Sequence, residues 1–239
     1  MNVVISQPMF FPWVGMFEQI RSADIYVDYN DVQFSKGSFT SRVQIKTVNG
    51  VKWLSVPLKK FNLGDCINEV MIDAKQDWKS QHLRQLNQAY ASSQYYRDML
   101  TLVEKVYDQP HQTIGQLAHH SMIACCAYYG LDKDTKFVDV RDLQISGKSS
   151  VRVRDIVKRL GGSCYITGLG AKKYLDHELF EASGVRVEYM NYKKLPYFQL
   201  HHGFTPYVSL LDLIANTGPD GFQYICSKTI YWKDLFRNI

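Results

Sequence analysis

Residues 2–29 read NVVISQPMFFPWVGMFEQIRSADIYVDY, and this stretch decides the fold. Residues 2–6 are apolar enough for a buried strand, residues 16–24 carry apolar side chains at helical spacing, and residues 25–29 again have strand character. A strand, a loop, a helix and a second strand in so short a length predict a compact βαβ unit. Such a unit has parallel strands and a right-handed crossover.

The segments that follow predict a hairpin and then a run of helices. Residues 42–58 alternate around Asn49-Gly50, which is the strongest short-range signal for a β-hairpin. From residue 77 to residue 129, apolar side chains recur at helical spacing. We therefore expect a helical subdomain over residues 75–130 that is inserted between two α/β parts.

Alternating strand and helix patterns return after the helical stretch. The strand-like residues are 136–140, 164–167 and 185–189, and a helical pattern covers residues 151–160. This alternation predicts an α/β fold with a mostly parallel sheet and flanking helices. We expect a single α/β domain over residues 1–239, with a loop and a short helix in its tail.

The composition is that of a folded protein in a reducing compartment. Hydrophobic residues make up 46% and charged residues 21% of the chain, which argues against disorder. The five cysteines form no CxxC pair, so we expect neither a disulfide framework nor a structural zinc site. We find no signal peptide and no apolar run near the ~18 residues of a transmembrane helix. The expectation is a cytoplasmic protein without membrane insertion.

The net charge of +5 is mild and does not predict nucleic-acid binding. One basic cluster occurs, and we interpret it as a solvated face of the helix predicted over residues 151–160. Its members are Arg152, Arg154, Lys158 and Arg159. A small-molecule substrate therefore fits the charge better than a nucleic acid.

The loop over residues 7–15 is the first candidate for a ligand site. In an open parallel sheet, ligands bind beyond the carboxyl ends of the strands, and this loop directly follows the first strand. Its two prolines and Gly15 leave it little entropy to lose on binding. Gln7, Phe11 and Trp13 would contact the ligand. The alternative is that the aromatic residues plug the edge of the sheet.

Charged residues follow at the same edge. Asp28, Asp31 and Gln33 lie at the carboxyl end of the second strand. Arg42 and Lys46 share one face of the first hairpin strand, where they would bind a phosphate or a carboxylate. The alternative is that Arg42 and Lys46 are solvent-exposed charges on the hairpin and bind no ligand.

Two later segments add weaker signals. Gly168 and Gly170 follow a strand and permit close approach of a ligand to the backbone. Residues 146–150 (SGKSS) lack the first glycine of a P-loop, although a lysine and small residues before a helix suit a phosphate as well as they suit serine capping. Adjacent histidines point away from each other, so no metal site is indicated, and His202 is the first choice as general base. The sequence identifies no cofactor.

The chain resembles the WbqC-like protein family over essentially its whole length. The amino-terminal motif is specific, and it departs from the family pattern at Phe11, where tyrosine is expected. The matching residues are Gln7-Pro8, Phe11-Pro12-Trp13, Gly15, Phe17, Ile20, Ala23-Asp24, Asp31-Val32-Gln33-Phe34, Arg42, Ile45-Lys46, Trp53-Leu54, Val56-Pro57, Tyr165, Gly168, Tyr174-Leu175, Phe204, Pro206, Ser209, Asp212, Asn216 and Gly218.

This resemblance implies a bacterial protein of O-antigen and other surface-polysaccharide biosynthesis. A role implied there is modification of an activated amino sugar, for example N-acylation, and Asp212 joins the expected substrate-binding residues. A second, fainter similarity is to the nucleotidyltransferase-like layout of pantothenate synthetase. The His-x-Gly-His of that layout is absent from this chain.

Three functional hypotheses follow. The first is an enzyme that transfers an acyl group to a nucleotide-linked amino sugar, in which Asp31 or His202 accepts the amine proton. The second is an ATP-dependent ligase or nucleotidyltransferase with a requirement for Mg²⁺. The third is a non-catalytic partner in a biosynthetic assembly, whose aromatic loop binds another protein.

Overall fold

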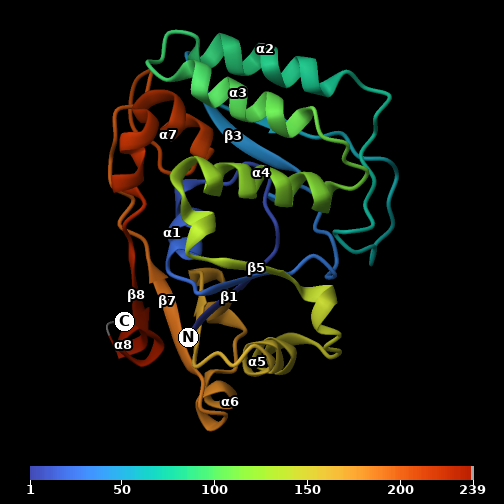
Figure 1. Ribbon diagram of the computed structural model, residues 1–239, viewed down its shortest axis with the longest axis vertical. Helices are drawn as coiled ribbons and strands as arrows, with labels where there is room; N and C mark the ends of the chain where they lie inside the picture. Colours follow the sequence, from blue (N-terminus) through green and yellow to red (C-terminus); the bar gives the residue numbers. More distant parts are fainter. Residues whose placement is uncertain (238–239) are drawn as a thin grey trace.

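The computed structural model describes residues 1–237, and within them the fold centres on a mostly parallel six-stranded sheet (Figure 1). This confirms the predicted α/β fold. Five strands run parallel, and β8 pairs with β7 in the antiparallel direction. The strands are β1 (Asn2–Ser6), β2 (Ile25–Asp28), β5 (Lys136–Asp139), β6 (Cys164–Thr167), β7 (Arg186–Asn191) and β8 (Lys228–Tyr231).

The strand order is β5-β2-β1-β6-β7-β8. The chain first builds outward from β1 to β2 and β5, then returns to the other side of β1 with β6, β7 and β8. The connections after β1 and β6 therefore leave the sheet in opposite directions. Sheets of this order have a crevice at that switch point, beyond the carboxyl ends of the two central strands.

Helices cover both faces of the sheet, and the central strands β1 and β2 therefore bury both of their faces (Figure 1). Val4 and Tyr26 belong to the core beneath α1 and α4, whereas Val3 and Val27 belong to the core beneath α5 and α6. The two layers thus follow from the alternation of side chains along a strand. The helices are α1 (Val14–Arg21), α4 (Ile114–Tyr129), α5 (Ser149–Arg159) and α6 (His177–Ala182).

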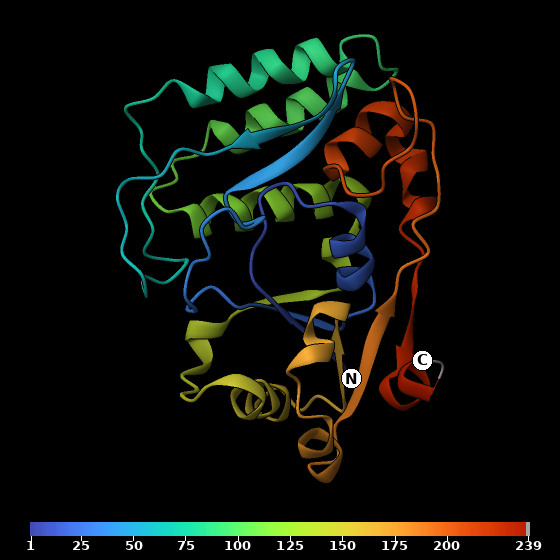
Figure 2. The ribbon, with the colours of Figure 1, turned by 180° about the vertical axis from the view of Figure 1, so that it is seen from behind.

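A second group of elements packs over α1 and α4 and extends their core. It contains the predicted hairpin, whose turn is formed by Val48 and Asn49 between the paired residues Thr47 and Gly50, and which lies beside α2 and α3 in Figure 2. The elements are β3 (Arg42–Thr47), β4 (Gly50–Ser55), α2 (Trp78–Tyr90), α3 (Tyr96–Tyr107) and α7 (Leu210–Thr217), while α8 (Trp232–Arg237) lies next to β8.

Local sequence signals explain the boundaries of α4, the helix that joins the two parts. Thr113 and Gln116 form a capping box at its amino end, and Gly130 ends it in the left-handed conformation with φ 70°. Its apolar residues are buried in the core that it shares with α1. α4 thus lies at the end of the helical stretch expected over residues 75–130 and stops at Gly130.

A buried polar network joins the hairpin to α2 and α7. The Lys46 backbone N–H donates to the Tyr90 hydroxyl at 3.0 Å, and that hydroxyl donates to Asp212 at 3.0 Å. Tyr197 donates to the other oxygen of Asp212 at 2.9 Å. Burial raises the pKa of Asp212 to about 6, although the two hydroxyls and Lys46 favour its ionised form.

We expect Asp212→Ala to lower the free energy of unfolding by about 3–5 kcal/mol, because it leaves two buried hydroxyls without their acceptor and removes a buried carboxylate that interacts with the charge of Lys46. The matched control is Asp220→Ala, at an exposed position in the segment after α7, which should change stability by less than about 0.5 kcal/mol. Urea unfolding of the three proteins measures both values. Equal stability of the two variants would contradict a structural role for the network.

His82 is a buried histidine held in its neutral form. Its Nε2 lies 3.1 Å from the Ser55 carbonyl oxygen, which can only accept, so Nε2 carries the proton. Nδ1 lies 2.9 Å from the Tyr107 hydroxyl and accepts from it. Burial lowers the pKa of His82 to about 4, because an imidazolium at this place would lose its hydration.

His82 should therefore make stability fall with acid. The unfolded chain binds a proton at pH values between about 6.5 and about 4, where the folded chain does not, so the contribution of His82 is present above this window and is lost within it. By pH 5 the loss is about 2 kcal/mol. We expect His82→Gln to be less stable than the parent at pH 7.5. Urea unfolding at pH 7.5 and pH 5 should show this difference in the free energy of unfolding shrink by about 2 kcal/mol. His202→Gln, at an exposed position, is the control.

Candidate functional site

A cleft of about 1040 Å³ lies at the switch point of the sheet. Its walls come from the loops after β1, β2, β6 and β7 and from the amino end of α5. Each of these segments follows the carboxyl end of a parallel strand or, for α5, begins the helix after β5. The strand order that reverses at β1 and β6 therefore creates the opening.

The loop over residues 7–15 divides its side chains between this cleft and the core. Gln7, Met9 and Trp13 line the cleft. Phe10 and Phe11 are completely buried, with their ring centroids 4.9 Å apart. Both alternatives considered for this loop are thus present, since part of it plugs the sheet edge and part of it forms a wall of the cleft.

A backbone conformation that is unusual for a bulky residue causes this division. Phe11 has a φ of 39°, in the left-handed region. Its N–H donates to the Ser121 hydroxyl at 2.9 Å, and its carbonyl accepts from the Ser209 hydroxyl at 2.7 Å. The two serines belong to α4 and to the start of α7, so both helices hold the loop in place.

Trp13 forms an aromatic wall at the border of the cleft. Its ring lies 5.0 Å from that of Tyr192 and 5.6 Å from that of Tyr207, measured between centroids. Gly15 makes room for it, because a Cβ at this position would lie 2.2 Å from a carbon of the Trp13 ring. The glycine is therefore required by the position of the indole, and not by its own backbone angles.

Among the described residues that line the cleft, Asp31 is the single carboxylate, and Arg152 binds both of its oxygens. The guanidinium donates to Oδ1 of Asp31 at 2.9 Å and to Oδ2 at 2.5 Å. Its Nε donates to the Ile145 carbonyl, and its Nη1 donates to the Tyr29 hydroxyl at 3.4 Å. The prediction that Arg152 belongs to a solvated helix face was wrong: its side chain is 11% exposed, because Asp31 and Tyr29 cover it.

The amino end of α5 forms the positively charged side of the cleft. Gly147, Lys148 and Ser149 line it, and the side chain of the N-cap residue Lys148 makes no capping hydrogen bond. The N–H groups and partial positive charge at the start of a helix favour anions. With Lys148, Arg152 and Lys194 against Asp31, the cleft carries more positive than negative charge.

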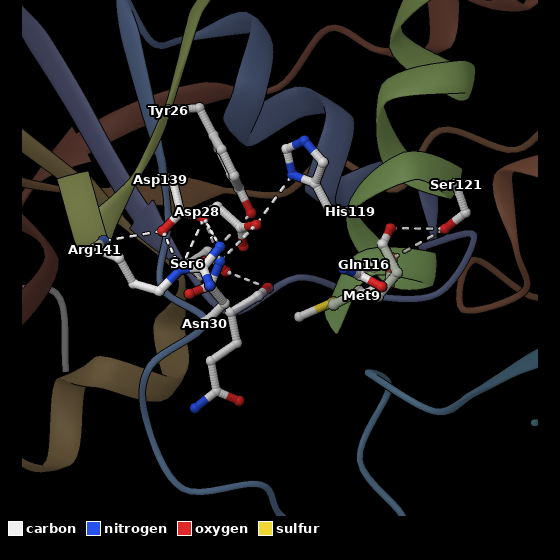
Figure 3. Close-up of polar contacts among 12 residues, drawn as sticks. Ser6, Met9, Tyr26, Asp28, Asn30, Gln116, His119, Ser121, Asp139 and Arg141 are labelled. Carbon is white, nitrogen blue, oxygen red and sulfur yellow. Dashed lines mark hydrogen bonds and ion pairs between the residues drawn. The ribbon is translucent and has the colours of Figure 1, made fainter. Parts of the chain in front are cut away.

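A second polar cluster lies on the other side of the same sheet edge, at the carboxyl ends of β2 and β5 (Figure 3). Nδ1 of His119, on α4, lies 3.0 Å from Oδ2 of the buried Asp28. The Asn30 amide donates to Asp28 at 3.3 Å and to Asp139 at 3.0 Å, and Arg141 holds Asp139 with two nitrogens. Burial raises the pKa of Asp28, while contact with His119 lowers it.

The structure brings five of the twelve expected site residues together in the cleft. They are Gln7, Trp13, Asp31, Gln33 and Gly168. The others lie elsewhere. Phe11 is in the core and Gly15 is beneath Trp13. Asp28 pairs with His119, and Arg42 stacks on Trp53 at 4.1 Å. Lys46 and Asp212 belong to the buried network, and His202 lines a separate hollow of about 400 Å³ together with Lys46.

Sequence reasoning missed Tyr29, Tyr192 and Arg152. The first two each come directly after a parallel strand, so the rule that ligands bind at carboxyl ends would have found them if applied to every strand. Arg152 offered no local signal, because its partner Asp31 is 121 positions away in the sequence.

Residues 1–237 contain neither a metal-ligand cluster nor a membrane-spanning helix. No group of three or more histidine, cysteine, aspartate or glutamate side chains is placed to hold a metal ion. In the same residues, no helix combines the length and the apolar character needed to cross a membrane.

The fold and the cleft define a doubly wound α/β protein with a polar, aromatic-walled cleft at its switch point. A sequence model of the WbqC-like protein family matches residues 7–224, and the chain belongs to this family. It is 29% identical over 227 residues to the uncharacterized protein Rv1507c of Mycobacterium tuberculosis. The aligned region covers 94% of this chain and 97% of that relative. No solved structure matches the chain.

The contact between Gly15 and Trp13 predicts a coupled pair. Gly15→Ala should destabilise the protein by about 1–3 kcal/mol, because the new methyl group overlaps the indole. In a Trp13→Ala background the same change should be neutral or stabilising by up to about 1 kcal/mol, since alanine is the better helix former. Thermal unfolding of the four proteins gives the coupling energy.

Gly170→Ala serves as the control for this cycle, because a Cβ there meets no atom within 4 Å. Additive effects at positions 13 and 15 would mean that the indole does not occupy the place described.

Proposed function

We propose that this protein is an enzyme that binds a nucleotide-linked small molecule in the switch-point cleft. The observation that supports it most directly is the position of Arg152, Lys148 and the amino end of α5 along one wall of a cleft of about 1040 Å³. Diphosphate groups bind at such helix ends in sheets of this strand order. The aromatic side chains of Trp13, Tyr192 and Tyr207, which line the same cleft, suit a base or a sugar ring.

The substrate that we propose is a nucleotide-linked amino sugar, and the reaction is transfer of an acyl group to its amine. Arg152 and Lys148 bind the phosphates, and Trp13 and Gln7 contact the sugar. Asp31 positions Arg152, because both of its oxygens accept from the guanidinium. We place the reaction in the cytoplasm and in surface-polysaccharide biosynthesis, as the family resemblance implies. The five cysteines of the chain, all unpaired, fit a reducing compartment.

An ATP-dependent ligase or nucleotidyltransferase is the second candidate. The strand order favours it, because the crevice at the switch point is where mononucleotides bind in sheets of this kind. It differs from the first candidate in requiring ATP with Mg²⁺ and in releasing pyrophosphate.

A thermal-shift panel separates the candidates. The ligands are ATP with Mg²⁺, acyl-CoA esters, and nucleotide-linked sugars with and without a free amine. A ligand at about 100 times its dissociation constant adds roughly 2.7 kcal/mol of stability. We expect stabilisation by the amino-sugar nucleotide and a further shift with an acyl donor. Stabilisation by ATP with Mg²⁺ alone would favour the second candidate. No shift with any ligand would remove both and favour a non-catalytic partner protein.

Arg152→Gln tests the proposed phosphate contact. It should weaken binding of the stabilising nucleotide ligand by about 10–100-fold, the value of one or two hydrogen bonds to a charged group. Arg159→Gln, an exposed position on the same helix, is the matched control and should bind like the parent. Equal binding by the two variants would place the phosphates away from α5.

A further inference from the structure

The histidine–carboxylate pair at the second polar cluster lies outside the cleft lining and has no role in the function proposed above. Nδ1 of His119 lies 3.0 Å from Oδ2 of Asp28, which is 3% exposed, although the ring is not turned so that an N–H on Nδ1 points along this contact. An ionised Asp28 can only attract or accept a proton, so it favours the tautomer with the proton on Nδ1. Nε2 is then the nitrogen with the free lone pair. Among residues 1–237 it has no hydrogen-bond partner, and the side chain is 30% exposed.

The carboxylate behind the imidazole is itself fixed. The Asn30 side chain donates to both Asp28 and Asp139, and Arg141 anchors Asp139 (Figure 3). A fixed carboxylate sets the tautomer of its histidine and stabilises the imidazolium that forms when the histidine takes a proton. A histidine that only tied α4 to the sheet would not need this second layer of contacts.

The pair stands next to the cleft wall. Ser6 lies beside Asp28 in the register of β1 and β2, and Ser6, Gln7 and Met9 line the cleft. On α4, Ser121 follows His119 by two residues and binds the backbone of the same loop. Adjacent strands are about 4.8 Å apart, so the imidazole and the cleft lie on the two sides of one short loop.

We propose that His119, positioned by Asp28, is the proton acceptor of this protein, in place of Asp31 or His202. The inference rests on the proposed function for the identity of the substrate. Asp31 has both oxygens bound to Arg152, and His202 lines a different hollow. For this role the sugar of a nucleotide held in the cleft must extend past the loop over residues 7–15 to the end of β2, because His119 does not itself line the cleft.

The proton balance of the transfer is as follows. The amine nitrogen of the sugar attacks the carbonyl carbon of an activated acyl donor, here a thioester, and forms the C–N bond. Nε2 of His119 takes the proton that this nitrogen must lose. The C–S bond breaks, and the imidazolium returns the proton to the leaving thiolate, which restores the neutral histidine. No oxidant, reductant or metal is required.

Several charged or titratable groups face this imidazole from the elements around it. Asp28, Tyr26 and Asp139 come from β2 and β5, Arg141 follows β5, and His120 is the neighbour of His119 on α4. Of these, only Asp28 contacts the ring within hydrogen-bond distance. A test of the pair must therefore separate His119 from His120.

The first experiment needs no substrate. Diethyl pyrocarbonate acylates unprotonated, accessible imidazole nitrogen, and tandem mass spectrometry of the digest reads each histidine separately. His119 should react at pH 7, and Asp28→Asn should slow it about tenfold, because an asparagine can donate to Nδ1 and move the proton to Nε2. His202, exposed and without a carboxylate partner, should react equally in both proteins, and buried His82 should not react. An unreactive His119, or one indifferent to Asp28→Asn, overturns the proposal.

The second experiment measures turnover with UDP-glucosamine and acetyl-CoA as probes, through release of the CoA thiol. His119→Ala should lower kcat at least about 100-fold with little change in KM, and added imidazole should restore part of it. A purely structural histidine would not respond to imidazole. Full activity of His119→Ala overturns the proposal. If His119 reacts as expected and the parent shows no thiol release, the proposed substrate is wrong while the histidine–carboxylate base stands.

Discussion

The structure depends on how the chain turns after its first strand. Two hydroxyls, from Ser121 and Ser209, hold the backbone of Phe11 in a left-handed conformation that a phenylalanine rarely adopts. Because of this turn, the residues before and after it face the cleft while Phe10 and Phe11 enter the core. The same contacts tie α4 and the start of α7 to the central strand. The shape of the cleft and the packing of α4 and α7 against the loop therefore have one cause.

Periodicity and turn chemistry were sufficient to predict the sheet, the hairpin and the end of α4. These features are set by residues close together in the sequence, such as Asn49-Gly50 and Gly130. The antiparallel strand β8 was not predicted, because its four residues follow an irregular segment and pair only along one side. Short edge strands carry too little pattern to be recognised alone.

The candidate site was only half predictable for a related reason. The approach of Asp31 to Arg152 joins residues on different elements, and no spacing in the sequence indicates it. Lys46 and Asp212 were expected to bind the substrate, and the structure does not place either in the cleft. Polar residues near the expected edge suggest a ligand, yet the structure places both in a network that satisfies them with other protein groups. Buried polar groups need partners in either case, and the sequence does not say whether a ligand or the fold supplies them.

The strand order also has a consequence for synthesis on the ribosome. β1 emerges first and can pair with β2 almost at once, but its other neighbour, β6, begins at Cys164. At roughly 5–20 residues per second, one edge of the central strand stays open for about 8–30 s while the intervening chain is made. During that interval the apolar residues Val3, Val4 and Ile5 form an unpaired strand edge. The nascent chain therefore exposes an apolar strand of the kind that chaperones bind, until β6 is made and the sheet can close.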